Sequence, residues 1–546
     1  MYKLQGDDLS AKDRLVACAK HYIGYGASEG GRDYHHTEIS DYSLYNYYLP
    51  AFRSAVDAGT GTVMSSFNEI NGVPTGLNGK YLTDILRGDL GFEGYVISDW
   101  DQVKQLMVHG VAQDEDDCSR LALTAGVDMD MNDKCYINSL EQLVADGKVT
   151  EETINTAVRR VLRIKLAKGI FEHPYCEIKT IDRAQHIKDS RELAAECMVL
   201  LKNNGVLPLD KSKKVFVSGP LMRERRALLG TWTLDGIAAE TPNFIEAMRD
   251  TVEKGKLLFD KDESGTFDYI TRDSADAEVV VLALGESHRI SGEQNCVRDI
   301  ALPKSQIELI KHAKLLGKKV VGVFFCGRPL ALEGVAEYLD AALYAWHGGT
   351  QTAIAACDIL FGNMSPSGKL PITFPRTTGQ IPIYYNCPPA ARHINGYYSN
   401  REARTVYHDG LSSPLYPFGY GLSYTTFDYG APVCDNNEIT LDELKQGATF
   451  KISVDVTNSG NFDGKEVVQL YIRDKVASRV RPMRELKDYK KVFIKQGETE
   501  KVEFELGYKQ LGFYFETGEY VVEPGEFTVF VGTDSLTTKN FTVVVK

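Results

Sequence analysis

The carboxylate of Asp99 stands at the end of the apolar run FEGYVISDW, which has the composition of a short buried strand. A carboxylate in this place has three interpretations: it caps the helix that follows, it belongs to a structural hydrogen-bond network, or it reacts with a ligand. Trp100 comes next, and an indole ring stacks well on the apolar face of a sugar ring. Together the two residues favour a carbohydrate ligand, and both structural interpretations stay open.

A second polar pair, Lys20 and His21, lies in the run LVACAKHYI. Both side chains donate hydrogen bonds of the kind that sugar hydroxyls accept. Neighbouring side chains of a regular strand point to opposite faces, so both can reach one ligand only if the strand is broken there. Gly24 and Gly26 follow closely and permit such a break. The alternative is a surface lysine beside a half-buried core histidine.

Two further carboxylates, Glu286 and Glu293, lie in the segment AEVVVLALGESHRISGEQNC, the first at a strand end and the second in a loop. Acidic residues in such loops are usually only solvated. Glycoside hydrolysis, however, requires two carboxyl groups, one ionised below the anomeric carbon and one protonated beside the leaving oxygen. Asp99 and one of these glutamates could form such a pair, although sequence spacing does not show that they meet.

The first 170 residues alternate strand-like runs with helical stretches. The runs lie at 15–23, 60–68, 92–100 and 122–131. Strands that alternate with helices predict a parallel sheet with right-handed crossovers. A closed eight-unit barrel usually takes about 250 residues. Four βα units therefore predict a partial TIM-type barrel over residues 1–180.

The rest of the chain has two other patterns. Residues 181–385 carry continuous apolar strands such as KKVVGVFFCG between helices, which predicts an open α/β sandwich domain. Residues 386–425 are rich in Pro, Gly, Tyr and Asn and are interpreted as a linker. Residues 426–546 alternate polar and apolar positions between regularly spaced turns, which predicts a fibronectin type III-like β-sandwich. The predicted fold class is thus multidomain α/β plus β.

Composition excludes several functions. A net charge of −13 disfavours nucleic acid and anionic membranes as partners, and no apolar run approaches the ~20 residues of a membrane span. The sequence has no P-loop, GxGxxG, HExxH or GxSxG motif. Its ten cysteines are scattered without a CxxC pair, so nothing in their spacing indicates a zinc site, an iron–sulfur cluster or a redox dithiol. Unpaired thiols favour a reducing compartment such as the cytoplasm, while export stays open.

Longer motifs point to one family. The chain contains, in order, AKHYIGYGASEGGRDY, TVMSSFNEINGVP, YLTDILRGDLGFEGYVISDW, TAGVDMDM, MVLLKNNGVLPL, GEQNCVRDIALP, LFGNMSPSGKLPITFP and YPFGYGLSYTTF. Together these motifs resemble glycoside hydrolase family 3, and most of all its bacterial three-domain β-glucosidases. The resemblance covers nearly the whole chain. It implies a mechanism that needs no metal or cofactor.

The resemblance also implies two catalytic carboxylates. Asp99 of the SDW motif matches the family's nucleophile. Glu293 in the loop SGEQNCVRDI aligns best with the general acid/base of the second domain. Glu286 is the alternative for this role, and if Glu293 is the acid/base, Glu286 is expected to bind substrate.

The remaining matches are residues that bind sugar. Lys20 and His21 match a pair that holds hydroxyls of the sugar in the −1 subsite. Met64 and Phe67 match positions that line this subsite, and many relatives have Tyr where Phe67 stands. Trp100 matches an aromatic residue that stacks on the +1 sugar. The loop YGASEGGRDYHH differs in spacing from that of members that hydrolyse N-acetylglucosaminides, so this activity is not expected.

One departure from the family pattern is large. The resemblance implies half a barrel upstream of Lys20, with an Asp and an Arg that bind the same sugar, yet Met1 lies close to this strand. Three explanations stay open: a truncated gene product, a split enzyme whose first half is another chain, or a half-barrel closed by self-association. The expected partners are accordingly a homo-oligomer or a complementary N-terminal half-barrel chain, besides an oligosaccharide or aryl β-glycoside substrate.

The expected function is that of a retaining exo-acting β-glycosidase. A β-glucosidase that releases terminal non-reducing β-D-glucosyl residues through a covalent glycosyl-enzyme fits the resemblance best. The alternatives are a β-xylosidase or α-arabinofuranosidase of the same family, and a catalytically incomplete fragment or partner subunit.

Overall fold

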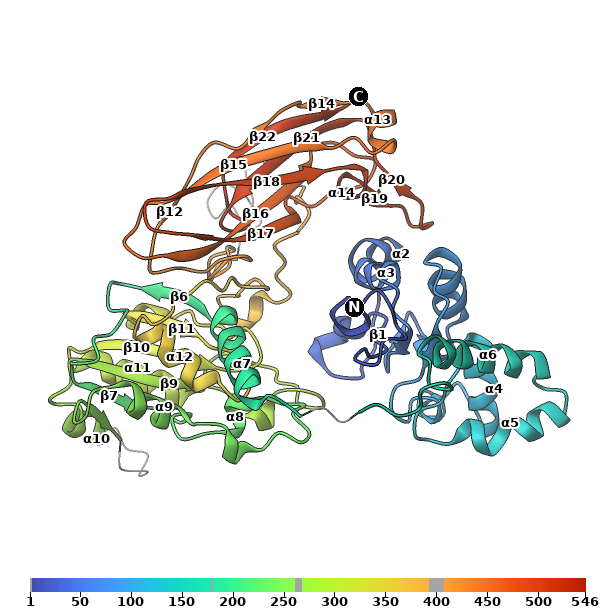
Figure 1. Ribbon diagram of the computed structural model, residues 1–546, viewed down its shortest axis with the longest axis horizontal. Helices are drawn as coiled ribbons and strands as arrows, with labels where there is room; N and C mark the ends of the chain where they lie inside the picture. The colour runs from blue at the N-terminus through green and yellow to red at the C-terminus, as the bar shows by residue number, and fades with distance from the viewer. Residues whose placement is uncertain (1, 178–179, 261–267, 392–406) are drawn as a thin grey trace. The chain divides into compact units, whose positions relative to one another are not determined.

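The computed structural model describes residues 2–177, 180–260, 268–391 and 407–546. The chain forms two compact units, shown in Figure 1. The first consists of Met1–Ile181 together with Phe513–Val521, and the second of Asp182–Gly512 together with Val522–Lys546. The backbone therefore passes from one unit to the other at three places.

A small parallel sheet forms the centre of the first unit. Its strands β1 (Cys18–Tyr22), β2 (Thr62–Ser65) and β5 (Tyr95–Ile97) lie in the order β1-β2-β5. A single parallel bridge joins Ile97 to Met129, so a fourth extended segment lies beside β5. Strands in this order are connected by helices, as the alternating pattern predicts.

The predicted strand at 122–131 is wrong in its first part. Helix α4 (Glu115–Ala125) occupies that part and ends at Gly126, whose φ of 115° lies in the left-handed region. Glycine ends helices in this way because it has no Cβ to clash there. The extended segment starts only after Gly126.

The other helices of the first unit follow the predicted helical stretches. Helix α6 begins after Thr150, whose side chain caps the helix by accepting a hydrogen bond from the Thr153 amide. The helices are α2 (Asp41–Ser43), the π-helical turn η3 (Leu44–Tyr48), α3 (Leu49–Asp57), the π-helix η5 (Lys80–Asp89), α5 (Cys135–Ala145) and α6 (Glu151–Ala167).

A buried ion-pair network connects η5, β5 and α6. The Asp128 carboxylate lies 2.6 Å from Nη2 of Arg87 and 2.7 Å from Nη1 of Arg160. It also accepts a hydrogen bond of 2.8 Å from the Val96 amide. Both carboxylate oxygens are thus paired, which offsets the cost of burying the charge.

A hairpin distant in sequence completes the first unit. Its strands β19 (Phe513–Tyr514) and β20 (Tyr520–Val521) pair with each other. The Asn46 amide in η3 donates to the Tyr514 carbonyl at 2.8 Å and accepts from the Tyr514 amide at 3.0 Å. The Arg53 guanidinium lies 4.9 Å from the centre of the Tyr514 ring. The periodicity of the sequence does not predict this docked hairpin.

A mixed sheet forms the α/β part of the second unit. Its described strands lie in the order β6-β11-β10-β9-β7-β8, and only the edge strand β6 is antiparallel to its neighbour. The sequence pattern predicts the central strands but misses the two edge strands, β6 and β8. The bounds are β6 (Val199–Asn203), β7 (Val215–Ser218), β8 (Leu257–Phe259), β9 (Val279–Gly285), β10 (Lys319–Phe325) and β11 (Ala341–Tyr344).

Helices cover both faces of this sheet, so its strands are buried on both sides. Helices α7 (Arg183–Cys197), α9 (Phe244–Thr251) and α12 (Thr352–Leu360) pack on one face. Helix α11 (Lys304–Leu315) packs on the other.

Part of the predicted linker covers the core of this α/β domain. Residues 392–406 lie outside the described residues, but the chain from 407 to 425 is described. Leu415, Tyr416 and Tyr420 pack against the hydrophobic core on the α11 side of the sheet. This segment is therefore an ordered part of the α/β domain's surface.

Two antiparallel sheets form the C-terminal sandwich. One has the order β12-β15-β13 with β18 beside β15, and the other has the order β14-β22-β21-β16-β17. Burial alternates along β15, as the polar and apolar alternation predicts. The bounds are β12 (Phe427–Tyr429), β13 (Val433–Cys434), β14 (Glu438–Ile439), β15 (Phe450–Asn458), β16 (Gly464–Asp474), β17 (Glu485–Ile494), β18 (Thr499–Leu506), β21 (Gly525–Gly532) and β22 (Asn540–Val545).

Candidate active site

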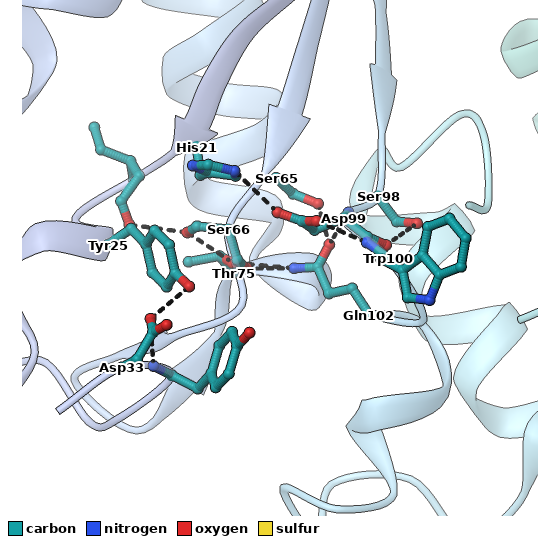
Figure 2. A network of polar contacts seen from close by, with 12 residues as sticks. His21, Tyr25, Asp33, Ser65, Ser66, Thr75, Ser98, Asp99, Trp100 and Gln102 are labelled. Atoms are coloured by element: carbon teal, nitrogen blue, oxygen red, sulfur yellow. Dashed lines mark hydrogen bonds and ion pairs between the residues drawn. The ribbon is translucent and has the colours of Figure 1, made fainter. Parts of the chain in front are cut away.

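The carboxylate of Asp99 lies just beyond the carboxyl end of β5, and the residue is 7% exposed. Its Oδ1 accepts a hydrogen bond of 2.7 Å from the Trp100 amide, and its Oδ2 lies 3.3 Å from Nε2 of His21 (Figure 2). The next helical turn, η6 (Lys104–Leu106), has Val103 at its N-cap and no side-chain cap. Asp99 therefore does not cap the following helix, and its carboxylate is oriented toward the strand ends.

The strand that carries Lys20 and His21 is irregular at this pair. The pairing of β1 with β2 shifts register between Ala19 and Tyr22, which is the break that two neighbouring side chains need to reach one ligand. His21 is half-buried and contacts Asp99, whereas Lys20 is exposed to solvent.

Aromatic rings form one side of the site. The Tyr34 and Phe67 rings meet edge to face at 4.9 Å, and the Tyr25 ring lies 5.1 Å from that of His21. The Tyr25 hydroxyl donates to Oδ1 of Asp33 at 2.6 Å (Figure 2). Tyr25 and Tyr34 are not among the residues that the sequence singles out, although both stand in the motif YGASEGGRDY.

Two of the predicted substrate-binding residues differ sharply in exposure. Met64 on β2 is buried beneath the strand ends, whereas 59% of Trp100 is exposed. A buried thioether can form the floor of a sugar site, and an exposed indole offers a face for stacking.

Gln102 connects the end of β5 to the end of β2. Its Oε1 accepts hydrogen bonds from the Asp99 amide at 3.0 Å and from the Ser65 hydroxyl. Its Nε2 donates to the Ser66 carbonyl and, at 3.3 Å, to Oγ1 of Thr75 (Figure 2). The buried amide thus fixes the backbone of Asp99, and the sequence gives no signal that identifies it.

Glu293 belongs to the second unit, where it lines a cavity of about 290 Å³. Its loop passes close to Thr231 at Gly292, whose φ is 91° and whose missing Cβ would lie 2.7 Å from the Thr231 hydroxyl. Only glycine fits that position without strain. The residues that line the cavity are Arg226, Gly230, Thr231, Trp232, His288, Ser291, Glu293, Gln294 and Asn295.

Glu286 stands in a different environment from Glu293. It is 4% exposed, and its Oε2 lies 3.0 Å from Nε of Arg328. Burial raises the pKa of Glu286 above its ordinary value, and the positive charge of Arg328 opposes that shift. Glu286 is thus one half of a buried ion pair beside the loop that carries Glu293.

Sequence comparison places these features in a family. Residues 4–164 match the model of the glycosyl hydrolase family 3 N-terminal domain, residues 198–424 that of the family 3 C-terminal domain, and residues 466–535 that of a fibronectin type III-like domain. A periplasmic beta-glucosidase of Salmonella typhimurium is 36% identical over 98% of this chain and 74% of its own length. The chain belongs to glycosyl hydrolase family 3.

Other relatives of this family 3 chain agree with that assignment. The crystal structure of a beta-glucosidase from Listeria innocua in complex with glucose matches it with a TM-score of 0.94 and 36% identity, over all of this chain and 76% of the other. A beta-xylosidase of Formosa agariphila is 34% identical over 97% of this chain and 75% of its own length. The multidomain α/β architecture with a C-terminal fibronectin type III-like sandwich is thus that of family 3.

Across the described ranges, no group of three or more His, Cys, Asp and Glu side chains is arranged to hold a metal ion. In the same ranges, no helix is both long and apolar enough to span a bilayer.

Proposed function

We propose that this family 3 chain is a retaining exo-acting β-glycosidase, and specifically a β-glucosidase that acts on terminal non-reducing β-D-glucosyl residues. The observation that carries the proposal is the buried carboxylate of Asp99 at a strand end, with one oxygen bonded to the Trp100 amide and the other beside His21. Relatives named as beta-glucosidases that match nearly the whole chain support the choice of sugar.

In the proposed mechanism, an oxygen of Asp99 attacks the anomeric carbon while Glu293 protonates the departing oxygen. A covalent glycosyl ester of Asp99 forms, and the aglycone leaves. Glu293 then removes a proton from water, which attacks the anomeric carbon and releases Asp99 and the sugar. Retaining enzymes hold their two carboxyl groups about 5–5.5 Å apart, so this mechanism requires such a separation during turnover.

The other predicted residues would bind the sugar. Lys20 and His21 can donate hydrogen bonds to hydroxyls of the −1 sugar. Met64 and Phe67 would form the apolar floor of that subsite, and the exposed ring of Trp100 would stack on the +1 sugar. No step of this mechanism calls for a metal or an organic cofactor.

Turnover by a Glu293→Ala variant tests the acid/base assignment. We expect kcat/KM for phenyl β-glucoside, a poor leaving group, to fall about 10²–10⁴-fold, as for the loss of a general acid. The rate of glycosylation by dinitrophenyl β-glucoside should change little, because that leaving group needs no proton. Glu308→Ala, on the exposed side of α11, is the control. Equal losses with both substrates would refute the role of Glu293.

A β-xylosidase is the second candidate, because two Formosa agariphila relatives carry that name at 34% and 35% identity. The two enzymes differ in whether the site accommodates the C6 hydroxymethyl group. The ratio of kcat/KM for nitrophenyl β-glucoside to that for nitrophenyl β-xyloside separates the candidates. A ratio well below one would favour the xylosidase.

We also propose that the sheet of the first unit is the C-terminal half of a barrel that further βα units complete. Strand β1 lies at one edge of the described sheet. Helix α6 presents Val158, Leu162 and Leu166 at a spacing of four residues, and these side chains are 46%, 38% and 57% exposed. An apolar helix stripe of this kind is normally packed against a neighbouring element.

The proposed partner segment corresponds to the part of the relatives that this chain does not cover, since it spans about three quarters of their length. The test measures nitrophenol release by the purified chain alone and after mixing with a polypeptide that carries the upstream half-barrel. Full activity of the chain alone would refute the need for a partner segment. Activity only after mixing would support it.

A further inference from the structure

The loop that carries Glu293 is attached to neighbouring strand ends through Arg328. Residues 286–295 leave the carboxyl end of β9, and Arg328 follows the adjacent strand β10. Nε of Arg328 pairs with Glu286 at the start of this loop, and Nη2 of the same guanidinium donates to the carbonyl of Ile290. One side chain thus bonds to the loop at two points, the second only three residues before Glu293.

The position of Arg328 is itself fixed. The buried hydroxyl of Tyr344, at the end of β11, donates to the Arg328 carbonyl at 2.5 Å and accepts from the Leu330 amide at 3.1 Å. The amide of Glu286 donates to the Phe325 carbonyl at 3.0 Å. The ion pair is therefore built on the ends of three neighbouring strands rather than on mobile chain.

A close backbone approach holds the same loop at a third point. A Cβ at Gly327 would lie 2.6 Å from the Ser291 hydroxyl, so Ser291 packs directly against this glycine. Ser291 is buried and stands two residues before Glu293. Contacts at Glu286, Ile290 and Ser291 therefore leave few degrees of freedom to the residues just before the proposed acid.

From this geometry we propose that Arg328 and Glu286 are positioning residues that fix the loop of Glu293 for proton transfer. The inference rests on the proposed role of Glu293 as acid/base. It assigns Glu286 a role other than substrate binding or direct acid catalysis. General acid catalysis depends on hydrogen-bond geometry, so displacing the loop would weaken protonation of the leaving group without touching attack by Asp99.

The chain offers a well-matched control. Arg376 is 18% exposed in its side chain, against 19% for Arg328, and it also pairs with a glutamate, Glu333, at 3.2 Å. Its Nε donates to the Ser413 carbonyl at 2.9 Å. Arg376→Gln thus removes the same kind of contacts from the same domain but leaves the Glu293 loop alone.

The first measurement does not need turnover. Amide hydrogen exchange over residues 287–295 should be faster in Arg328→Gln and Glu286→Gln than in the native chain, and unchanged in Arg376→Gln. Glu286→Gln keeps the shape of the side chain, so it stays informative if Arg328→Gln does not fold. Unchanged exchange over 287–295 in a folded variant of the pair would overturn the proposal.

The second measurement uses the leaving-group series. For Arg328→Gln, kcat/KM should fall about 10–100-fold for phenyl β-glucoside and less than about threefold for dinitrophenyl β-glucoside, because only the first needs the acid. Arg328→Lys keeps the charge and should recover part of the loss. With dinitrophenyl β-glucoside, azide should accelerate the breakdown of the Asp99 ester in Arg328→Gln. Azide attacks the anomeric carbon of this ester, which yields glycosyl azide and frees the carboxylate. The native enzyme should show no such acceleration.

The results separate the two proposals. Equal losses for both substrates in Arg328→Gln, with a clear split in Glu293→Ala, would overturn the positioning role and leave the acid/base assignment intact. No split in Glu293→Ala would overturn the acid/base assignment itself. If a double variant of Arg328 and Glu286 loses much more kcat/KM than either single variant, the two residues do not act as one unit, which would also contradict the proposal.

Discussion

Nε2 of His21 lies 3.3 Å from Oδ2 of Asp99, although 77 residues of the chain separate the two and each stands at the end of a different strand. β2 lies between these strands in the sheet, so the contact spans the strand ends above it. The second oxygen of Asp99 accepts from the Trp100 amide at 2.7 Å. The carboxylate is thus held in one orientation before any ligand binds.

Replacement of Asp99 tests the proposed nucleophile. We expect Asp99→Ala to lower kcat at least about 10³-fold with every aryl glucoside, since nucleophile deletions remove the covalent route. A fluoroglucoside that traps the covalent intermediate should label Asp99 in the native chain, as peptide mass spectrometry would show. Asp101→Asn changes an aspartate two residues away and is the control. A label on another side chain would contradict the assignment.

Asp128 provides a test of stability in the first unit. Its carboxylate bonds to Arg87, Arg160 and the Val96 amide, so Asp128→Ala leaves two guanidinium groups without their buried partner. We expect a loss of about 3–5 kcal/mol in the free energy of unfolding, the usual cost of breaking a buried ion pair. Urea unfolding measures it, and Asp84→Asn on the exposed side of η5 should shift stability little. A loss below about 1 kcal/mol would show that the network contributes no more to stability than exposed ion pairs do.

The sequence predicts the fold well wherever an element carries a clear pattern of its own, either a continuous apolar run or an alternation of polar and apolar residues. The central strands of the α/β domain and the main strands of the sandwich carry such patterns, and the structure confirms them. Elements whose stability comes from partners elsewhere are missed. Strand β6 is defined by its antiparallel pairing with β11, and the 513–521 hairpin by its contact with Asn46.

Asp474 in the sandwich should make stability depend on pH. Burial raises its pKa to about 6, against 3.8 for the ordinary value. Between these values the folded chain binds more protons than the unfolded chain. The contribution of Asp474 to the free energy of unfolding therefore falls as pH rises from about 4 to about 6. Asp474→Asn should therefore raise Tm relative to the native chain at pH 7.5, and the difference should shrink below pH 4.

The asparagine keeps an oxygen that can accept the Val476 amide bond, and Arg481 keeps its pairing with Glu485 at 2.9 Å. Asp455→Asn on the exposed side of β15 is the control. A lower Tm for Asp474→Asn at pH 7.5 would show that the ionised carboxylate stabilises the sandwich, contrary to this expectation.

Gly518 tests the docking of the hairpin. Its φ is 86°, and an added Cβ would lie 2.8 Å from the Tyr45 ring, so Gly518→Val must displace the hairpin from η3. Amide exchange over 513–521 should become faster. Gly497→Val is a matched control, because Gly497 has a φ of 77° but no atom within 4 Å of the missing Cβ. If both variants change amide exchange over 513–521 equally, the change comes from backbone strain alone and not from the contact with Tyr45.

The candidate site, like the fold, contains some residues that the sequence predicts and others that it does not. Asp99, His21 and Glu293 can be proposed from residue type and place, because reactive carboxylates at strand ends and in loops are recognisable. Gln102 and Arg328 cannot, since their roles depend on which carbonyls and amides they reach in three dimensions. An amide or a guanidinium with no special neighbour in sequence gives no local signal.

The hairpin at 513–521 also has a consequence for how the protein is made. The ribosome delivers the sheet and helices of the first unit first, but the segment that bonds to Asn46 emerges only after residues 182–512 have been made. Until then the surface of η3 that contacts the hairpin stays exposed to solvent, although the whole α/β domain and most of the sandwich have already left the exit tunnel. For the same reason no single cut of the polypeptide releases the first unit intact.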